Sequence, residues 1–122
     1  MKELILIFVG GGIGSVLRYL CTMFINSHNS STFPWATFCI NIVGCFLIGL
    51  FGSIAAKFGI SEHLRLMLTV GICGGFTTFS TFSNESLALL RSGNYLFFSL
   101  YLLLSILLGV LAMLLGSCMV KN

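Results

Sequence analysis

Long apolar runs separated by short polar stretches set the pattern of this chain of 122 residues. A helix that spans a lipid bilayer needs about 20 apolar residues, because the hydrocarbon core is about 30 Å thick. Runs of this length cover residues 4–25, 34–56, 63–90 and 95–120. Because the runs are continuous and do not alternate apolar with polar residues, they predict helices and not membrane strands. The sequence therefore predicts an all-α membrane protein, a single domain over residues 1–122 with four transmembrane helices.

The composition favours the bilayer as the solvent of this chain. Hydrophobic residues make up 57% of it and charged residues only 7%, with a mean hydropathy of +1.09. A soluble domain is about 25% charged, so the composition excludes a water-soluble enzyme. The net charge of +3 is too small to indicate nucleic-acid binding. The five cysteines lie within apolar runs without metal-ligand spacing, and we interpret them as small apolar residues.

Basic residues are divided only slightly unevenly between the two ends of the predicted helices. Four spans place both termini on one side, and that side carries Lys2, Lys57, Arg65 and Lys121. The other side carries Arg91, with Arg18 near its end of the first helix. A weak positive-inside bias permits insertion in both orientations. Two oppositely inserted copies can then pair as an antiparallel, dual-topology homodimer.

Small residues recur four positions apart in three of the predicted helices. The pairs are Gly10 and Gly14, Gly49 and Ser53, and Ala112 and Gly116. Small side chains let helix backbones approach closely where no hydrophobic force drives helices together. We expect these pairs at helix–helix contacts.

The third apolar segment carries a polar cluster in its middle. The glycine pair Gly74–Gly75 precedes five hydroxyl side chains, those of Thr77, Thr78, Ser80, Thr81 and Ser83. Glycine weakens a helix by about 1 kcal/mol relative to alanine, and irregular backbone at membrane depth needs cover from protein or water. The cluster predicts a third helix that is broken at its centre, as in transporters that hold ions there. The alternative is a kinked helix whose hydroxyls bond back to the preceding turn.

Two phenylalanines and one amide are the first candidates for contact with an ion. Phe79 and Phe82 lie three residues apart and share a helix face. An aromatic ring is positive at its edge, so two ring edges can line a narrow path for a small anion. Asn41 lies in an otherwise apolar run, where its amide either donates to an anion or joins two helices.

Polar residues also mark the first and fourth helices. Tyr101, Ser105 and Gly109 follow at steps of four and share one helix face. Arg18 is a cation inside the first span, where it either snorkels to its end of the helix or draws anions to a pore mouth. Glu85 is interpreted as an interfacial carboxylate near the end of the third helix. The interior then offers donors, ring edges and a cation without a central carboxylate, which favours anion transport over catalysis.

These residues resemble the CrcB/Fluc family of fluoride channels. The motifs that carry the resemblance are the glycine-rich first helix that ends in Arg18–Tyr19, the stretch Asn41–Gly44, and the run Gly74–Phe82. The resemblance covers essentially the whole chain. Gly109 departs from it, because some members continue the stripe of the fourth helix with a serine there.

The resemblance implies an antiparallel, dual-topology homodimer with two fluoride pathways. Such a protein lies in the bacterial cytoplasmic membrane and lets fluoride leave the cell passively, which reduces fluoride toxicity. Phe79 and Phe82 match the pore phenylalanines of the family. The implied polar track consists of Asn41, Ser80, Thr81, Tyr101 and Ser105. Arg18 joins the predicted pathway from its place in the first span.

The resemblance also implies a structural sodium ion at the centre of the dimer, bound by the backbone carbonyls of Gly74 and Thr77 from both subunits. The residues give a physical reason for such an ion. Carbonyls at a helix break lose their helical donors, and each unsatisfied group at membrane depth costs several kcal/mol. A monovalent cation suits neutral oxygens, since divalent ions usually take carboxylates.

One other class of membrane protein matches the gross pattern. A proton-coupled small-molecule exporter of the small multidrug-resistance type has a similar length, four helices and dual topology. It needs a carboxylate deep in the first helix, and the first helix here has none. A fluoride channel is therefore the prediction, and the exporter is the alternative.

Overall fold

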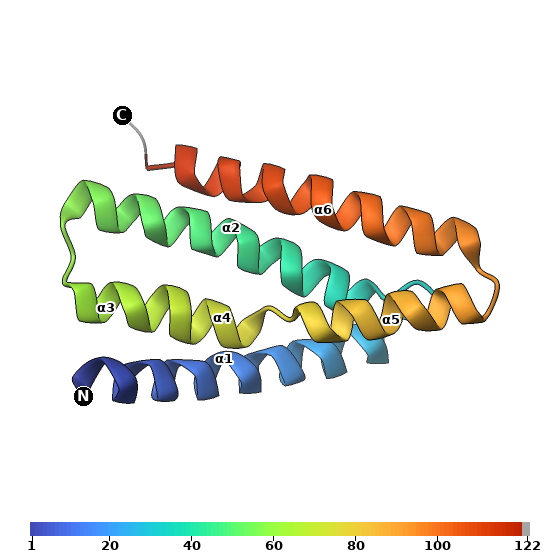
Figure 1. Cartoon of the computed structure of the whole chain (residues 1–122), viewed down its shortest axis with the longest axis horizontal. Helices are drawn as coiled ribbons and strands as arrows, with labels where there is room; N and C mark the ends of the chain where they lie inside the picture. Colours follow the sequence, from blue (N-terminus) through green and yellow to red (C-terminus); the bar gives the residue numbers. More distant parts are fainter. Residues whose placement is uncertain (121–122) are drawn as a thin grey trace.

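The structure, a computed structural model that describes residues 1–120, consists of helices joined by short turns (Figure 1). In chain order they are α1 (Lys2–Ser27), α2 (Trp35–Phe58), α3 (Glu62–Leu66), η1 (Met67–Cys73), α4 (Gly74–Phe76), α5 (Phe79–Arg91) and α6 (Tyr95–Cys118).

Within the described residues four segments are long and apolar enough to span a membrane. They are α1, α2, the composite segment Glu62–Arg91, and α6. The prediction of an all-α protein with four such helices is confirmed. The start of α1 and the end of α6 lie at the same end of the bundle (Figure 1). Lys121, which was counted with the basic residues of that end, lies outside the described residues.

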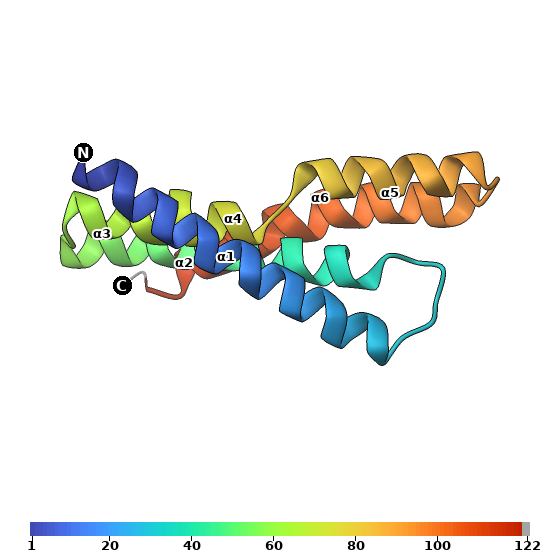
Figure 2. The same cartoon turned by 90° about the horizontal axis from the view of Figure 1, so that it is seen from below.

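The helices pack as two pairs. α2 runs along α6, and α1 runs along α3, η1 and α4. Beyond α4 the chain leaves α1, and α5 packs beside α6 (Figure 2). Within residues 1–120, α1 makes no contact with α5 or α6. The third span is therefore shared between the two pairs.

Glycines set the distance between α1 and the first half of the third span. A Cβ atom on Gly10 would lie 2.8 Å from the carbonyl oxygen of Met67, and one on Gly14 would lie 2.8 Å from the amide nitrogen of Phe76. Real Cβ atoms essentially never come this close to backbone. The expectation that Gly10 and Gly14 lie at a helix contact is confirmed.

The same device joins α2 to α6. A Cβ atom on Gly49 would lie 3.1 Å from the amide nitrogen of Ser117, and one on Gly116 would lie 2.9 Å from that of Leu50. Ser53 adds a polar link, because its Oγ donates to the carbonyl of Ser117 over 2.6 Å. Small residues on both helices thus allow contact between backbones.

The third helix is interrupted at its centre, but not at the glycine pair. Gly74 is helical, with φ −62° and ψ −39°, and α4 includes Gly75. The extended residues are Thr77, with φ −84° and ψ 159°, and Thr78, with φ −153° and ψ 120°. The predicted break is confirmed, and it falls at the two threonines of the predicted cluster and not at its glycine pair. A back-bond of the kind that the alternative required is also present, since Thr77 Oγ1 donates to the carbonyl of Cys73 over 3.0 Å.

A π-helical stretch, η1, precedes the break and was not predicted from the sequence. π-Helical turns are rare and are frequent near functional sites. Gly71 lies within η1, and a Cβ atom on it would lie 3.1 Å from the Cα atom of Gly10. The π-helical stretch therefore packs directly on the backbone of α1.

Aromatic side chains form the buried core where α5 meets α2 and α6. Tyr101 is fully buried, and its ring meets that of Phe33 edge-on at 5.5 Å. Phe33 also meets Phe38 and Phe97 edge-on, each at 5.6 Å. Phe82 packs on Tyr101 with ring centroids 4.9 Å apart. This cluster fixes the position of α5 on α6.

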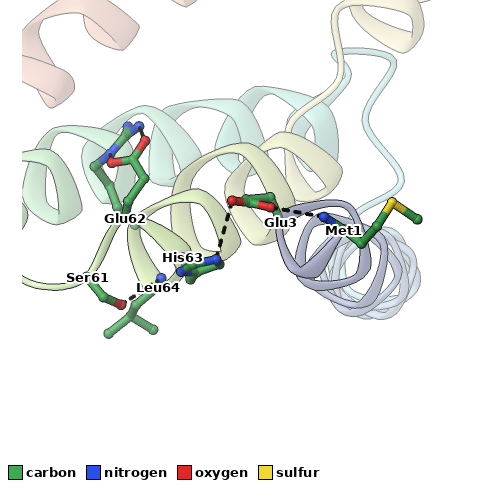
Figure 3. A network of polar contacts seen from close by, with 7 residues as sticks. Met1, Glu3, Ser61, Glu62, His63 and Leu64 are labelled. Carbon is green, nitrogen blue, oxygen red and sulfur yellow. Dashed lines mark hydrogen bonds and ion pairs between the residues drawn. The ribbon is translucent and has the colours of Figure 1, made fainter.

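A polar network joins the first residues of α1 and α3 (Figure 3). Glu3 Oε2 lies 3.4 Å from His63 Nε2, and Glu3 Oε1 lies 3.4 Å from the amino group of Met1. Ser61 caps α3, because its Oγ accepts from the amide of Leu64 over 3.2 Å. The network holds the two helix starts together at the end of the bundle that is remote from the break.

Candidate functional site

Asn41 of α2 binds the backbone of the broken third span at two points. Its Oδ1 accepts from the amide of Thr78 over 2.9 Å, and its Nδ2 donates to the carbonyl of Thr78 over 3.1 Å. One of the two N–H groups of the amide is thereby used, so at most one remains for an anion. The two interpretations of Asn41, as a donor and as a link between helices, are thus compatible in one side chain.

Two carbonyls beside the break lose their helical donors. In a continuous helix Gly74 would accept from the amide of Thr78, but that amide donates to Asn41. Thr77 would accept from the amide of Thr81, but that amide donates to Thr78 Oγ1 over 3.2 Å. The residues that the sequence predicted as sodium ligands, Gly74 and Thr77, are therefore among those whose carbonyls lose their helical donors at the break.

Hydroxyl groups cap the first turn of α5. Besides the amide of Thr81, Thr78 Oγ1 lies 3.2 Å from Thr81 Oγ1 and 3.2 Å from Ser80 Oγ. The amides of Phe79 and Ser80 also belong to this turn, where no preceding helical turn supplies a carbonyl. A helix N-terminus carries a partial positive charge. The hydroxyls and amides together make this point of the chain favourable for an anion.

An open groove of about 280 Å³ runs beside the break. Its lining includes Asn41, Thr77, Thr78, Phe79, Phe82 and Ser105. It continues into a second open groove of about 710 Å³ between α2 and α6, and Ser105 lines both. The structure thus brings four of the predicted pathway residues, Asn41, Phe79, Phe82 and Ser105, to one surface.

The two phenylalanines differ in exposure. Phe79 is 78% exposed, whereas Phe82 is half-buried against Tyr101. Their ring centroids lie 5.8 Å apart with an angle of 42° between the planes. The rings are therefore tilted with respect to each other, and the ring of Phe79 is accessible from the open side of the groove.

The other predicted residues of the polar track lie around this groove in different ways. Tyr101 lies behind Phe82 and is fully buried. Ser105 Oγ is buried and has no hydrogen-bond partner among the described residues. Ser80 is exposed on α5, and Thr81 is held by the hydroxyl of Thr78. Ser105 is thus the member of the track whose hydroxyl is still unpaired.

Glu85 lies beside the aromatic core. Its Oε1 accepts from the hydroxyl of Tyr101 over 2.9 Å. The spacing carried this signal, because Glu85 follows Phe82 by three residues and shares its helix face. Its hydrogen bond to Tyr101 was not predicted from the sequence, whereas the interpretation of Glu85 as an interfacial carboxylate stays a prediction.

Arg18 lies apart from the groove. Its Nε donates to the carbonyl of Gly75 over 3.1 Å, on the α1 side of α4. Arg18 is not among the described residues that line either groove. Gly109 does line the larger groove, and a Cβ atom on it would lie 3.5 Å from Cys45 Sγ, which is ordinary contact. A serine at this position would therefore fit.

Side chains of the usual metal-binding types do not gather in this structure. Within residues 1–120 no three or more His, Cys, Asp or Glu residues form a group that could hold a metal. The released carbonyls of Gly74 and Thr77 are neutral oxygens, which suit a monovalent cation better than a transition metal.

Comparison with known proteins gives matches over nearly the whole chain. Residues 5–117 match the family described as CrcB-like protein, Camphor Resistance (CrcB). A relative from Phocaeicola vulgatus, named fluoride-specific ion channel FluC, is 57% identical over 95% of this chain and 96% of its own length. Proteins of the same name from Bacteroides fragilis (strain YCH46) and Flavobacterium psychrophilum are 56% and 49% identical, over 95% and 100% of this chain and 94% and 99% of their own lengths.

Proposed function

Because this chain belongs to the CrcB family, we propose that it is a fluoride-selective ion channel, which exports cytoplasmic fluoride passively and so reduces fluoride toxicity. The observation that carries this proposal is the 57% identity, over 95% of the chain, to a protein named as a fluoride-specific channel. Its place is the bacterial cytoplasmic membrane, which it crosses with four helices.

The groove beside the break supplies chemistry that suits fluoride. Fluoride is small and strongly hydrated, so close donors must replace its water. We propose Asn41, Ser80, Thr81 and Ser105 as such donors. In this proposal the ring edges of Phe79 and Phe82 lie beside them, and Tyr101 lies behind Phe82. Together these residues form the proposed fluoride pathway. In support, the hydroxyl of Ser105 is buried and unpaired among the described residues. The first turn of α5 adds the positive end of a helix.

A second copy of the chain is the natural cover for this groove. The pathway is open along one side, and the ring of Phe79 is 78% exposed. The weak charge bias between the two ends of the helices is compatible with insertion in both orientations. We therefore propose an antiparallel, dual-topology homodimer in which each groove is closed by the partner.

A sodium ion on the axis of this dimer would use the carbonyls of Gly74 and Thr77. Both carbonyls have lost their helical donors to side chains, and Gly74 is exposed to the outside of the single chain. When bound, such an ion would supply charge compensation for carbonyls that face each other across the axis. The fit rests on backbone oxygens, so side-chain changes at Thr77 should matter little.

The alternative of a proton-coupled small-molecule exporter is not supported. Among the described residues of α1 the acidic residue is Glu3, in the first turn of the helix. The carboxylate of Glu85 belongs to α5 and accepts a hydrogen bond from Tyr101. The relatives carry the name of a fluoride channel and not that of an exporter.

Efflux from liposomes tests the function. Purified protein is reconstituted in vesicles loaded with potassium fluoride, and release is followed with a fluoride electrode. We expect release down the fluoride gradient without a proton gradient, and far slower release of chloride in matched vesicles. Obligatory coupling to protons, or chloride efflux at the same rate, would overturn the proposal.

The dimer and the sodium ion need separate tests. Gly74→Val is accommodated by the single chain, because the nearest atom to a Cβ there is the carbonyl oxygen of Thr69 at 3.8 Å. We expect it to lose the dimer in light scattering, while Gly12→Val, where nothing lies within 4 Å, keeps it. Replacing sodium by N-methylglucamine should lower fluoride efflux by wild type. Unchanged assembly of Gly74→Val, or sodium-independent efflux, would contradict these proposals without touching the function.

A further inference from the structure

Side chains of two neighbouring helices bind the backbone where α4 ends. The amide of Thr77 still donates to Cys73, as in a helix. The next carbonyl, that of Gly74, is left free because Asn41 binds the amide of Thr78. The carbonyl after it, that of Gly75, accepts from Arg18 Nε over 3.1 Å. Side chains of α1 and α2 therefore replace the missing helical hydrogen-bond partners on either side of the break: Arg18 for the carbonyl of Gly75, and Asn41 for the amide of Thr78.

We infer that Arg18 is a positioning residue: the N–H at its Nε replaces the missing helical donor of Gly75 and fixes the end of α4, so that the groove residues keep their places. The inference assigns to Arg18 a role through one hydrogen bond and not through attraction of the anion. The efflux measurement below rests on the proposed fluoride channel function, whereas the deuterium-exchange measurement does not.

The packing of α1 explains how Arg18 reaches this carbonyl. Gly11, Gly14 and Arg18 follow at steps of three and four, so they share one face of α1. A Cβ atom on Gly75 would lie 3.1 Å from the Cα atom of Gly11, and one on Gly14 would lie 2.8 Å from the amide nitrogen of Phe76. The two backbones are in contact there, and the side chain one turn further along lies beside the last turn of α4.

The chemistry of the site favours an arginine. A charged side chain at membrane depth is costly unless it has partners. The C-terminus of a helix carries a partial negative charge, so a cation beside the end of α4 is favourable. Arg18 is half-buried and is not among the described residues that line the groove, so its contact is with the helix end and not with the groove.

Three substitutions separate the hydrogen bond from the charge. Arginine Nε and glutamine Nε2 are both attached to Cδ, so Arg18→Gln keeps a donor at the same place and removes the charge. Arg18→Lys keeps the charge and has a methylene at that place. Arg18→Asn has the same neutral amide as glutamine, one methylene too short. Arg91→Met, at the exposed end of α5, is the control for the loss of a cation.

Two readouts are measured on protein that is monodisperse in detergent: fluoride efflux from liposomes, and deuterium exchange of backbone amides in peptides that cover residues 74–80. We expect Arg18→Gln and Arg91→Met to resemble wild type in both. Arg18→Lys and Arg18→Asn should lower efflux and speed exchange by up to about tenfold, the size expected for the loss of a hydrogen bond worth about 0.5–1.5 kcal/mol.

The opposite pattern overturns the inference. If Arg18→Lys conducts normally and Arg18→Gln does not, the charge is what matters. If Arg18→Asn matches wild type, or if efflux falls while exchange over residues 74–80 is unchanged, Arg18 does not position α4. Should the lysine and asparagine variants fail to fold, normal efflux and exchange in Arg18→Gln support the inference, and their loss there refutes it. If wild type carries no fluoride, the proposed function fails while exchange still decides the role of Arg18.

Discussion

The two halves of the third span differ in what holds them, although together they cross the membrane once. The first half, α3 to α4, lies against α1 with backbone on backbone, because glycines stand on both sides of the contact. The second half, α5, packs on α6 through Ser86 and Leu89, which are buried, and exposes Phe79, Ser80 and Asn84. The first half, which we call the anchor, is held by backbone contacts, and the second half carries Phe79, Ser80, Thr81 and Phe82 of the proposed pathway.

This difference shows how one span can be rigid and still present polar groups at membrane depth. The extended residues Thr77 and Thr78 end the anchor and let α5 begin with a fresh N-terminus. Asn41 and Arg18 bind the backbone on either side of the break. Changes in the anchor should therefore remove folded protein, whereas changes beyond the break should remove conduction from protein that still folds.

The largest effect is expected from a side chain placed in the anchor. Gly14→Val puts branched carbon against the carbonyl of Ile72 and the amide of Phe76, both of which are backbone. Overpacking typically costs about 1–3 kcal/mol, and more where backbone must move. We expect no monodisperse protein in size-exclusion chromatography. Gly12→Val is the matched control, because a Cβ there meets nothing within 4 Å. Normal elution of Gly14→Val would show that the contact with α1 is loose.

The second-largest effect is expected from Asn41→Asp, which should lose fluoride conduction while the protein still folds. The aspartate cannot donate to the carbonyl of Thr78, and it repels an anion in the groove. Fluoride efflux should fall by about 100-fold or more, since charges about 4 Å apart repel by about 4 kcal/mol at an effective dielectric constant of about 20. Asn94→Asp is the control: Asn94 uses only its Oδ1, which accepts from the amide of Phe97. Equal efflux in the two variants would remove Asn41 from the pathway.

Phe82→Ile should have a smaller effect on efflux. Isoleucine keeps apolar bulk against Tyr101 but removes the aromatic ring at the groove, whose edge we propose as a contact for the anion. Aromatic pairs are worth about 0.5–1.5 kcal/mol beyond the area that they bury, so efflux should fall by about two- to tenfold while the protein stays folded. Phe8→Ile, at a position that is 81% exposed on α1, should conduct as wild type does. Wild-type efflux in Phe82→Ile would mean that bulk alone matters there.

The sequence predicted the spans and the break because both depend on local composition. Apolar runs of the required length are visible directly, and extended residues were expected within a hydroxyl cluster. The exact place of the break was not visible, since Gly74 and Gly75 are both helical and Gly75 packs on the backbone of α1. A weak helix former becomes helical when tertiary packing requires a small side chain.

The site was predictable in its residues but not in their partners. Asn41, Phe79, Phe82 and Ser105 do meet at one groove. The partners of Arg18 and Glu85 lie 57 and 16 residues away along the chain, at Gly75 and Tyr101. Such contacts depend on how helices pair, which local periodicity does not specify. The hydrogen-bond partner of a charged side chain within a span could therefore not be predicted from the sequence.

The smallest effects should come from the side chain of Thr77, and they separate a backbone function from a side-chain function. Thr77→Ser keeps the hydroxyl that donates to Cys73 and loses a methyl beside Gly44, at a cost of about 1 kcal/mol of unfolding free energy. Thr77→Val keeps the shape and loses the hydrogen bond, again at about 1 kcal/mol. Both leave the released carbonyl of Thr77 in place, so efflux should stay within about twofold of wild type, because the proposed cation site uses backbone oxygens. Thermal unfolding in detergent checks the stabilities, and sodium titration of fluoride efflux checks the site. If Thr77→Val is folded and inactive while Thr77→Ser conducts, the hydroxyl of Thr77 is the functional group. The proposed pathway would then include the side chain of Thr77, and not only its backbone carbonyl.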